Sequence, residues 1–353
     1  MSNVIELAVP SRIMPLEARV TALLALFAQH RRTGEDVFWL KENAEMLNIL
    51  QSTGLPTPPE ALVVHAGFYT QAEKRLRFFP QYYRFILSLA LDLEDLGMPG
   101  EQAQKMVDFA ASEGLAQAEM SDLQRAEARR LMGRRGVDPV RDPGLDDRLL
   151  AFMHRTATFA LPNKKAAYEL THIIFYLTEY GSRKVDLGAE VVTSLHFAGL
   201  TAFLDQNADL LAEICICMHY LGETPPPVWT AWLRQETAYF SVEEGPSVSI
   251  NDNYHDFLIC NWHEAVIGGP VFRKAFGEGR MRFDKAPTQT VALREISQAM
   301  LALDDARVGD WPIMRRRMAD TVSEQSLDML EIAASTSQHF EAYFEGFARA
   351  GGQ

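Results

Sequence analysis

The chain has few cysteines and no long hydrophobic run, and both shortages limit what it can be. Only three cysteines occur among its 353 residues, an odd number that does not form a disulfide framework. Its longest apolar runs, such as residues 85–91, fall far short of the ~20 residues that a membrane-spanning helix requires. The first residues also lack a basic stretch followed by an apolar run. We therefore expect a cytoplasmic protein without a membrane span.

The sequence motifs of several common chemistries are missing as well. The chain contains no glycine-rich phosphate loop, dinucleotide fingerprint, Gly-x-Ser-x-Gly, His-Glu-x-x-His or Cys-x-x-Cys motif. Hydride transfer, P-loop chemistry and serine hydrolysis are therefore poor hypotheses. The formal net charge of -13 provides no broad basic footprint for phosphate groups, so we expect no nucleic acid partner.

What the sequence does contain is helical periodicity. In residues 16–30 the apolar side chains recur at i, i+3, i+4 and i+7, and the same spacing returns along most of the chain. No segment alternates with period two for long enough to predict a sheet. The sequence therefore predicts an all-α, multi-helix array without substantial sheet. Helices after residue 145 come in pairs with short turns, an arrangement that suits an α/α toroid or a stack of helical hairpins.

One segment interrupts this pattern more strongly than the others. Residues 133–144, GRRGVDPVRDPG, are rich in glycine, proline and charge, so they disfavour a continuous helix. The segment suggests a boundary between an N-terminal helical region, 1–135, and a C-terminal helical region, 145–353, which carries the cysteine and histidine cluster. The alternative is that both regions form one continuous core.

All three cysteines and several histidines fall close together in the C-terminal region. On a helix over residues 208–221, Glu213 and Cys217 share one face at i, i+4, and Cys215 lies between them. His255 follows at the start of a later helix. Carboxylate, thiolate and imidazole groups together suit tetrahedral Zn²⁺. The alternative is that the cysteines pack as small hydrophobic residues in the core.

These spacings resemble the zinc site of protein prenyltransferase β subunits, which are α/α toroids. In that family the ligands are an aspartate, a cysteine two residues on, and a histidine that follows a tyrosine. The resemblance implies ligand roles for Glu213, Cys215 and His255, with glutamate in place of aspartate and Tyr254 before the histidine. It covers only this part of the chain, and the glycine-rich repeats of the family are missing.

A polar stripe on another apolar helix provides a candidate catalytic residue. His172 lies within the segment ELTHIIFYLTEY, among threonine, tyrosine and glutamate side chains. Burying such groups is costly unless they bind one another or a ligand. His172 is therefore predicted to be a general acid or base in a pocket wall. The alternative is an internal hydrogen-bond network that fixes the helix register.

Two functions of different classes follow from these observations. The first is a helical scaffold or adaptor without catalysis, whose cysteines are structural and whose partner is a protein. The alternative is an α-helical enzyme or ligand-binding protein with an apolar pocket, lined by the Cys/His/Glu cluster, for a hydrophobic small molecule. In that second hypothesis Glu213, Cys215, Cys217 and His255 could bind zinc, which would act on an isoprenoid-like or thiol substrate.

Overall fold

The described part of the chain, residues 14–285 and 291–349 of a computed structural model, contains seventeen α-helices, four short 3₁₀ or π-helical segments and one two-stranded antiparallel sheet. This confirms the predicted all-α fold. The helices are α1 (Leu16–Ala25), α2 (Val37–Thr53), α3 (Ala66–Phe78), α4 (Tyr83–Asp95), α5 (Gln102–Ser112), α6 (Asp122–Gly133), α7 (Leu145–Met153), α8 (Thr156–Phe159), α9 (Lys164–Leu177), α10 (Ala189–Leu204), α11 (Ala208–Tyr220), α12 (Pro227–Tyr239), α13 (Tyr254–Val266), α14 (Ala292–Leu303), α15 (Trp311–Met318), α16 (Glu324–Thr336) and α17 (Phe340–Ala348).

Several of these helices begin where the sequence places a capping side chain. At six starts an aspartate, asparagine or serine accepts a hydrogen bond from a backbone N–H of the first turn, which has no partner within the helix. These caps fix the first turn of α2, α6, α9, α11, α15 and α16. The capping residues are Asp36, Ser121, Asn163, Asn207, Asp310 and Ser323.

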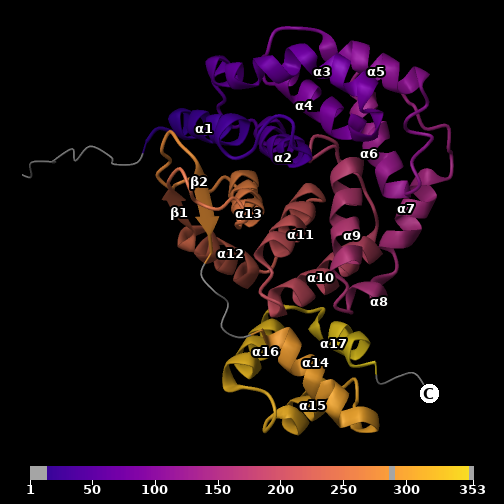
Figure 1. The fold of residues 1–353 in the computed structure, drawn as a ribbon. Helices are drawn as coiled ribbons and strands as arrows, with labels where there is room; N and C mark the ends of the chain where they lie inside the picture. Colours follow the sequence, from indigo (N-terminus) through magenta and orange to yellow (C-terminus); the bar gives the residue numbers. More distant parts are fainter. Residues whose placement is uncertain (1–13, 286–290, 350–353) are drawn as a thin grey trace, which may run out of the picture.

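Six helices form a closed ring. Helix α2 contacts α4, α4 contacts α6, α6 contacts α9, α9 contacts α11, and α11 contacts α13. Helix α13 then contacts α2, so the ring closes between two helices that are about 200 residues apart in the sequence (Figure 1). The ring joins the predicted regions 1–135 and 145–353 at two places, α6 with α9 and α13 with α2.

The intervening helices pack outside this ring. Helices α3, α5, α7, α10 and α12 each follow one ring helix and precede another, and each contacts at least one of them. This alternation of inner and outer helices is the arrangement of an α/α toroid. Most outer helices bury only a narrow stripe, whereas α2, α4, α11 and α13 bury residues on several sides. The difference follows from having protein on both faces of a ring helix and on one face of an outer helix.

Helix α10 is an outer helix that is nevertheless buried nearly all round. Helices α14, α16 and α17 contact its outward side, and the group α14–α17 forms a separate layer at one end of the molecule (Figure 1). On its other side α10 approaches α12 closely at Gly199. A Cβ atom at Gly199 would lie 2.3 Å from the Trp229 ring, so only glycine allows this packing.

A buried arginine connects the two-stranded sheet to the ring. The sheet pairs β1 (Ser241–Glu244) with β2 (Met281–Asp284) in antiparallel register, with α13 between them in the sequence. The Arg31 guanidinium donates to Glu42 of α2 at 2.9 Å and to Asp252, in the loop before α13, at 2.8 Å. It also donates to the backbone carbonyl of Met281 at 3.0 Å. All polar groups of this cluster are thus paired, as a buried charge requires.

The segment between α6 and α7 is irregular, as its glycine and proline content predicts. It is attached to the ring by ion pairs. Arg134 binds Asp92 at 2.7 Å, and Arg135 binds Glu94 at 2.9 Å, both on α4.

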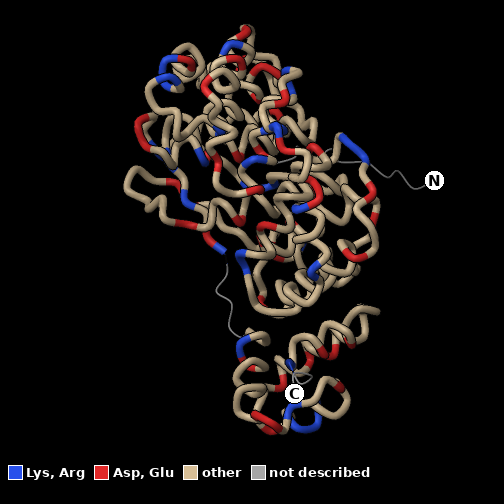
Figure 2. The backbone as a smooth tube through the Cα atoms, turned by 90° about the vertical axis from the view of Figure 1, so that its right-hand side faces the viewer, with Lys and Arg blue, Asp and Glu red and all other residues tan. Residues whose placement is uncertain are grey.

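Among the described residues, every helix is too short or too polar to cross a lipid bilayer. Basic and acidic residues are interspersed along the described backbone rather than gathered in blocks (Figure 2).

Candidate functional site

A cavity of about 290 Å³ lies at the centre of the helical ring. Every one of the six ring helices contributes to its wall, because each turns one face toward the ring axis. The wall brings together residues that are far apart in the sequence. One representative from each ring helix, in order, is Glu45, Ser88, Glu127, His172, Glu213 and His255.

On one side of this central cavity, His255 lies between carboxylates of two other helices. Its Nδ1 is 3.4 Å from Glu45 Oε2 on α2, and its Nε2 is 3.7 Å from Asp209 Oδ2 on α11. Burial alone would lower the pKa of His255, but Glu45 and the other nearby carboxylates raise it to about 9. Burial would raise the pKa of Glu45, yet His255 and Lys41, at 3.6 Å, hold it below its usual value. Both members of this pair are therefore charged at neutral pH.

On α11, which neighbours α13 in the ring, the Glu213 carboxyl lies in a different environment. Its side chain is buried on α11, and Oε2 accepts a hydrogen bond from Thr171 Oγ1 at 2.6 Å. His172 Nδ1 lies 3.8 Å away and donates to the Tyr168 carbonyl at 2.7 Å. Burial raises the pKa of Glu213, and these neighbours only partly oppose it. The pKa of Glu213 is thus shifted in the opposite direction to that of Glu45.

A third carboxyl, Glu127 of α6, completes the acidic groups of the wall. Arg84 Nη1 of α4 donates to Glu127 Oε2 at 2.6 Å. Burial raises the pKa of Glu127 despite this ion pair. The cavity therefore combines one ionised carboxylate with two carboxyls that hold their protons more tightly.

Aromatic side chains form the remaining wall. The rings of Phe175 and Trp262 lie 4.8 Å apart, and Tyr180 stacks on both of them, at 5.5 and 5.7 Å. The Arg130 guanidinium lies 4.3 Å from the Tyr180 ring centroid on its other side. The backbone at Glu179 and Tyr180 is left-handed, with φ of 48° and 54°. Such strained backbone is frequent at functional sites, and here it positions Tyr180 in the cavity wall.

The structure brings together three of the predicted site residues and separates two others from them. His172, Glu213 and His255 line the central cavity. Cys215 and Cys217 are buried outside its lining, and the Cys217 thiol donates to the Thr171 carbonyl at 3.5 Å. Burial raises the pKa of both thiols, which disfavours the thiolate that a metal would need.

The predicted zinc site has no counterpart in this arrangement. Within the described ranges, no group of three or more His, Cys, Asp or Glu side chains is arranged to hold a metal ion. The reason is helical geometry: Glu213 points toward the ring axis, whereas the cysteines beside it on α11 pack among apolar side chains. Glu213, Cys215, Cys217 and His255 therefore do not converge on one point.

Sequence reasoning missed several residues of this cavity. Glu45, Glu127 and Lys41 carry no motif and resemble solvent-facing charges on amphipathic helices. One available signal was the segment KENAE in α2, where several polar residues share a stretch with a strong apolar pattern. Glu42 and Asn43 within it are indeed buried.

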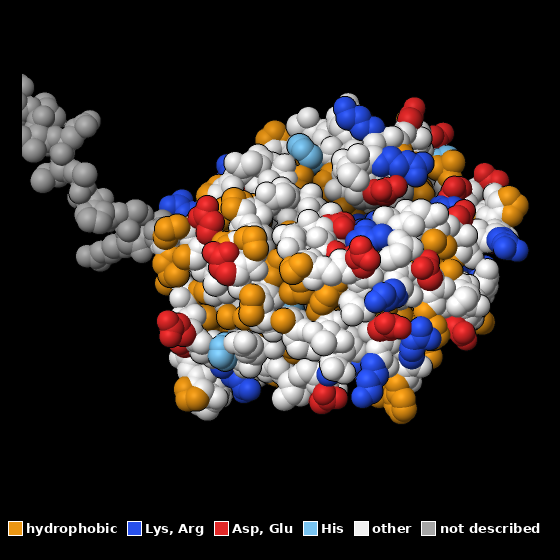
Figure 3. All heavy atoms as spheres, turned by 90° about the horizontal axis from the view of Figure 1, so that it is seen from above, with side chains coloured by type: hydrophobic (Ala, Val, Ile, Leu, Met, Phe, Trp, Pro, Cys, Tyr) orange, Lys and Arg blue, Asp and Glu red, His pale blue; other side chains and the backbone are white. Residues whose placement is uncertain are grey.

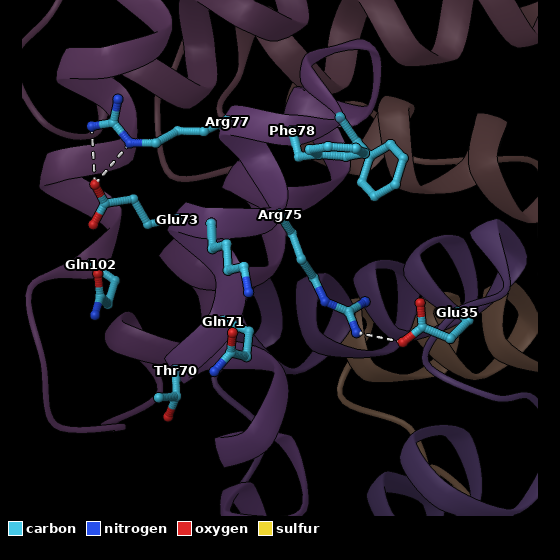
Figure 4. A pocket seen from close by; sticks show the side chains of 10 residues that line it. Glu35, Thr70, Gln71, Glu73, Arg75, Arg77, Phe78 and Gln102 are labelled. Carbon is cyan, nitrogen blue, oxygen red and sulfur yellow. Dashed lines mark hydrogen bonds and ion pairs between the residues drawn. The ribbon is translucent and has the colours of Figure 1, made fainter.

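A larger hollow of about 790 Å³ lies on the outer surface, along α3. We call it the outer groove. Four of its charged groups are paired with one another: Arg77 donates to Glu73 at 3.0 Å, and Arg75 donates to Glu35 at 3.0 Å (Figure 4). Phe78 forms an exposed part of its wall. The outer groove is thus a surface feature in which both carboxylates are paired and in contact with water.

The chain belongs to the family described as a domain of unknown function, DUF6902, whose model matches residues 1–350. No curated protein and no solved structure matches the chain. These comparisons show no likeness to prenyltransferases, and the described residues lack the metal site. The resemblance at Glu213, Cys215 and His255 is therefore a local spacing without a shared zinc centre.

Proposed function

We propose that the central cavity binds a small molecule and carries out general acid–base chemistry on it. The observation that supports this most is that two carboxyls from different helices of the ring, Glu45 and Glu213, line one cavity in contrasting environments. One is paired with an imidazolium and ionised, and the other is buried beside a hydroxyl. Opposed pKa shifts within one site are typical of acid and base pairs.

In this proposal Glu213 donates a proton to the substrate and Glu45 accepts one from it. The two transfers balance, since one proton leaves the protein and one enters it. His255 acts as a positioning residue, because its charge keeps Glu45 ionised. His172, 3.8 Å from Glu213, is placed to exchange the proton of that carboxyl with solvent, since its side chain is 36% exposed. A zinc-dependent reaction on an isoprenoid-like or thiol substrate receives no support from these residues, so we derive no step through a metal.

Comparison of four proteins tests this function: the wild type, Glu45→Gln, Glu213→Gln and, as a matched control, Glu73→Gln in the outer groove. Each is incubated with a mixture of small polar metabolites, and depletion is followed by mass spectrometry. We expect the wild type and Glu73→Gln to deplete the same compound. Loss of a general acid or base typically lowers rates by about 10²–10⁴-fold, so the two cavity variants should leave it nearly intact.

The competing function, a scaffold or adaptor without catalysis, predicts a different result. All four proteins would then leave the mixture unchanged, and no compound would stabilise the wild type against thermal unfolding. That pair of results would contradict the proposed function. Each substitution replaces a carboxylate by an amide of nearly the same shape, so a loss of depletion is not explained by altered packing.

A further inference from the structure

Two buried polar atoms in the wall of the central cavity lack hydrogen-bond partners. Glu45 Oε2 and His255 Nδ1 lie 3.4 Å apart, and neither has a hydrogen-bond partner of good geometry. Buried polar atoms without partners are uncommon in folded proteins. An acceptor and a donor side by side match a hydroxyl group, which can donate to a carboxylate and accept from an imidazolium at once. A small side-chain rotation would open room for it.

The charges of the wall are compensated within the wall itself. Glu45 has Lys41 and His255 within 4 Å, and Glu127 has Arg84 at 2.6 Å. Burial favours the neutral form of the remaining carboxyl, that of Glu213. A charged ligand would therefore enter a site that offers no uncompensated counter-charge, and it would lose its hydration in doing so. The electrostatics of the cavity favour a neutral ligand.

The aromatic side chains of the cavity wall limit the shape of the ligand. Phe175, Tyr176, Tyr180 and Trp262, from α9, the segment after it and α13, line one part of it. An aromatic surface favours the flat, C–H-bearing face of a ring. At about 290 Å³ the cavity is at the lower end of the range of small-molecule sites, so there is room for a ligand of monosaccharide size.

From these three features, and resting on the proposed function, we propose that the ligand is a neutral polyhydroxylated ring compound, such as a monosaccharide or a cyclic polyol. Its hydroxyl groups bind the Glu45–His255 pair and the Glu213 carboxyl, and its apolar face lies against Tyr176 and Trp262.

Ligand-observed NMR with a matched panel tests this inference. The probes are glucose, xylose and inositol, their charged counterparts glucuronic acid and glucosamine, and cyclohexanol as a ring with a single hydroxyl. We expect at least one neutral polyol to bind, and its charged counterparts and cyclohexanol to bind at least ten-fold more weakly. Glu45→Gln and the cavity-filling variant Ala44→Leu should each weaken polyol binding at least ten-fold, whereas Glu73→Gln should bind as the wild type does.

Two outcomes overturn the inference. The first is binding of glucuronic acid, glucosamine or cyclohexanol as tightly as the neutral polyols. The second is no binding of any polyol to wild-type protein whose thermal unfolding is cooperative. If either occurs while the metabolite mixture still contains a depleted compound, only the ligand class is wrong and the acid–base function stands. If the polyols bind but no compound is depleted, the acid–base function is wrong and the ligand class stands.

Discussion

The central cavity and the outer groove differ in how their carboxylates are buried and paired, and this difference does not follow their volumes. The outer groove is the larger, about 790 Å³ against about 290 Å³. Its carboxylates Glu35 and Glu73 each bind an arginine in contact with water, and Glu35 is 86% exposed. Exposed ion pairs of this kind contribute little free energy. The larger hollow is therefore chemically ordinary.

The central cavity is smaller, but its titratable groups come from five of the ring helices, and Glu213 among them is buried. The same type of side chain, a glutamate, is ionised at position 45 and holds its proton more tightly at position 213. Position in the ring, rather than residue type, produces this difference, because burial and neighbouring charges act on each carboxyl separately. The upper face of the molecule shows the usual mixture of acidic, basic and hydrophobic side chains (Figure 3).

The largest expected effect concerns the histidine of the cavity. Removing the negative charge at position 45 should lower the pKa of His255 from about 9 by roughly two units, because an adjacent opposite charge typically accounts for 1–3 units. NMR titration of the imidazole in Glu45→Gln measures this. Glu73→Gln should leave the pKa of His255 unchanged. A value that stays near 9 in Glu45→Gln would show that other carboxylates hold the proton.

Stability should depend on pH through the same residue. Because the pKa of His255 is raised in the folded state, its stabilising contribution is fully present below pH 6.5 and is lost as pH rises through about 9. The groups that face it are Glu45, Lys41, Asp209 and Glu213. Compared with His255→Asn, the wild type should therefore be more stable by about 2 kcal/mol at pH 6, and by little at pH 10. Urea unfolding of both proteins at the two pH values measures the difference.

A smaller effect of opposite sign is expected at position 213. Burial raises the pKa of Glu213, so its ionised form opposes folding, and this cost grows as pH rises above about 4.5. Glu213→Gln should stabilise the protein by about 1 kcal/mol at pH 8, a typical gain when a functional group is replaced, and by less at pH 5. Thermal unfolding at both pH values tests this. A destabilised variant would indicate that the carboxylate serves the fold.

The smallest effects belong to the outer groove. Phe78 is 76% exposed, so Phe78→Ser should change the free energy of unfolding by less than about 0.5 kcal/mol. Glu73→Gln should change it equally little, since exposed ion pairs contribute about 0–1 kcal/mol. Chemical denaturation measures both. If either variant lowered the free energy of unfolding by more than 2 kcal/mol, the outer groove would contribute more to stability than its exposed charges allow.

Most helices were predictable because a buried helix face requires apolar residues at helical spacing in the sequence. Helices α3 and α15 show a weaker pattern, because both bury only a narrow stripe among charged residues. Near the C-terminus the sequence alone does not reveal that the chain divides at Ser337 into α16 and α17. The ring itself could not be derived from the sequence, because the contact of α2 with α13 depends on how all the intervening helices pack.

The candidate site was predictable only in part. His172, Glu213 and His255 were found because scarce polar residues stand out on apolar helices. Cys215 was grouped with them by sequence spacing, although its side chain leaves α11 in another direction. Glu45 was not found, since a glutamate on an amphipathic helix is usually solvated.

The amino-acid sequence by itself therefore determined the helices, their caps and the scarcity of cysteine, since these depend on local hydrogen bonding and on periodic hydrophobicity. Tertiary structure decided which charged side chains leave water. Closing the ring places Glu45 beside His255, more than 200 positions apart in the sequence, and buries Glu213 on α11, the helix next to α13. The ionisation of each group depends on distances and burial in three dimensions, and neither quantity is encoded in any short stretch of the chain.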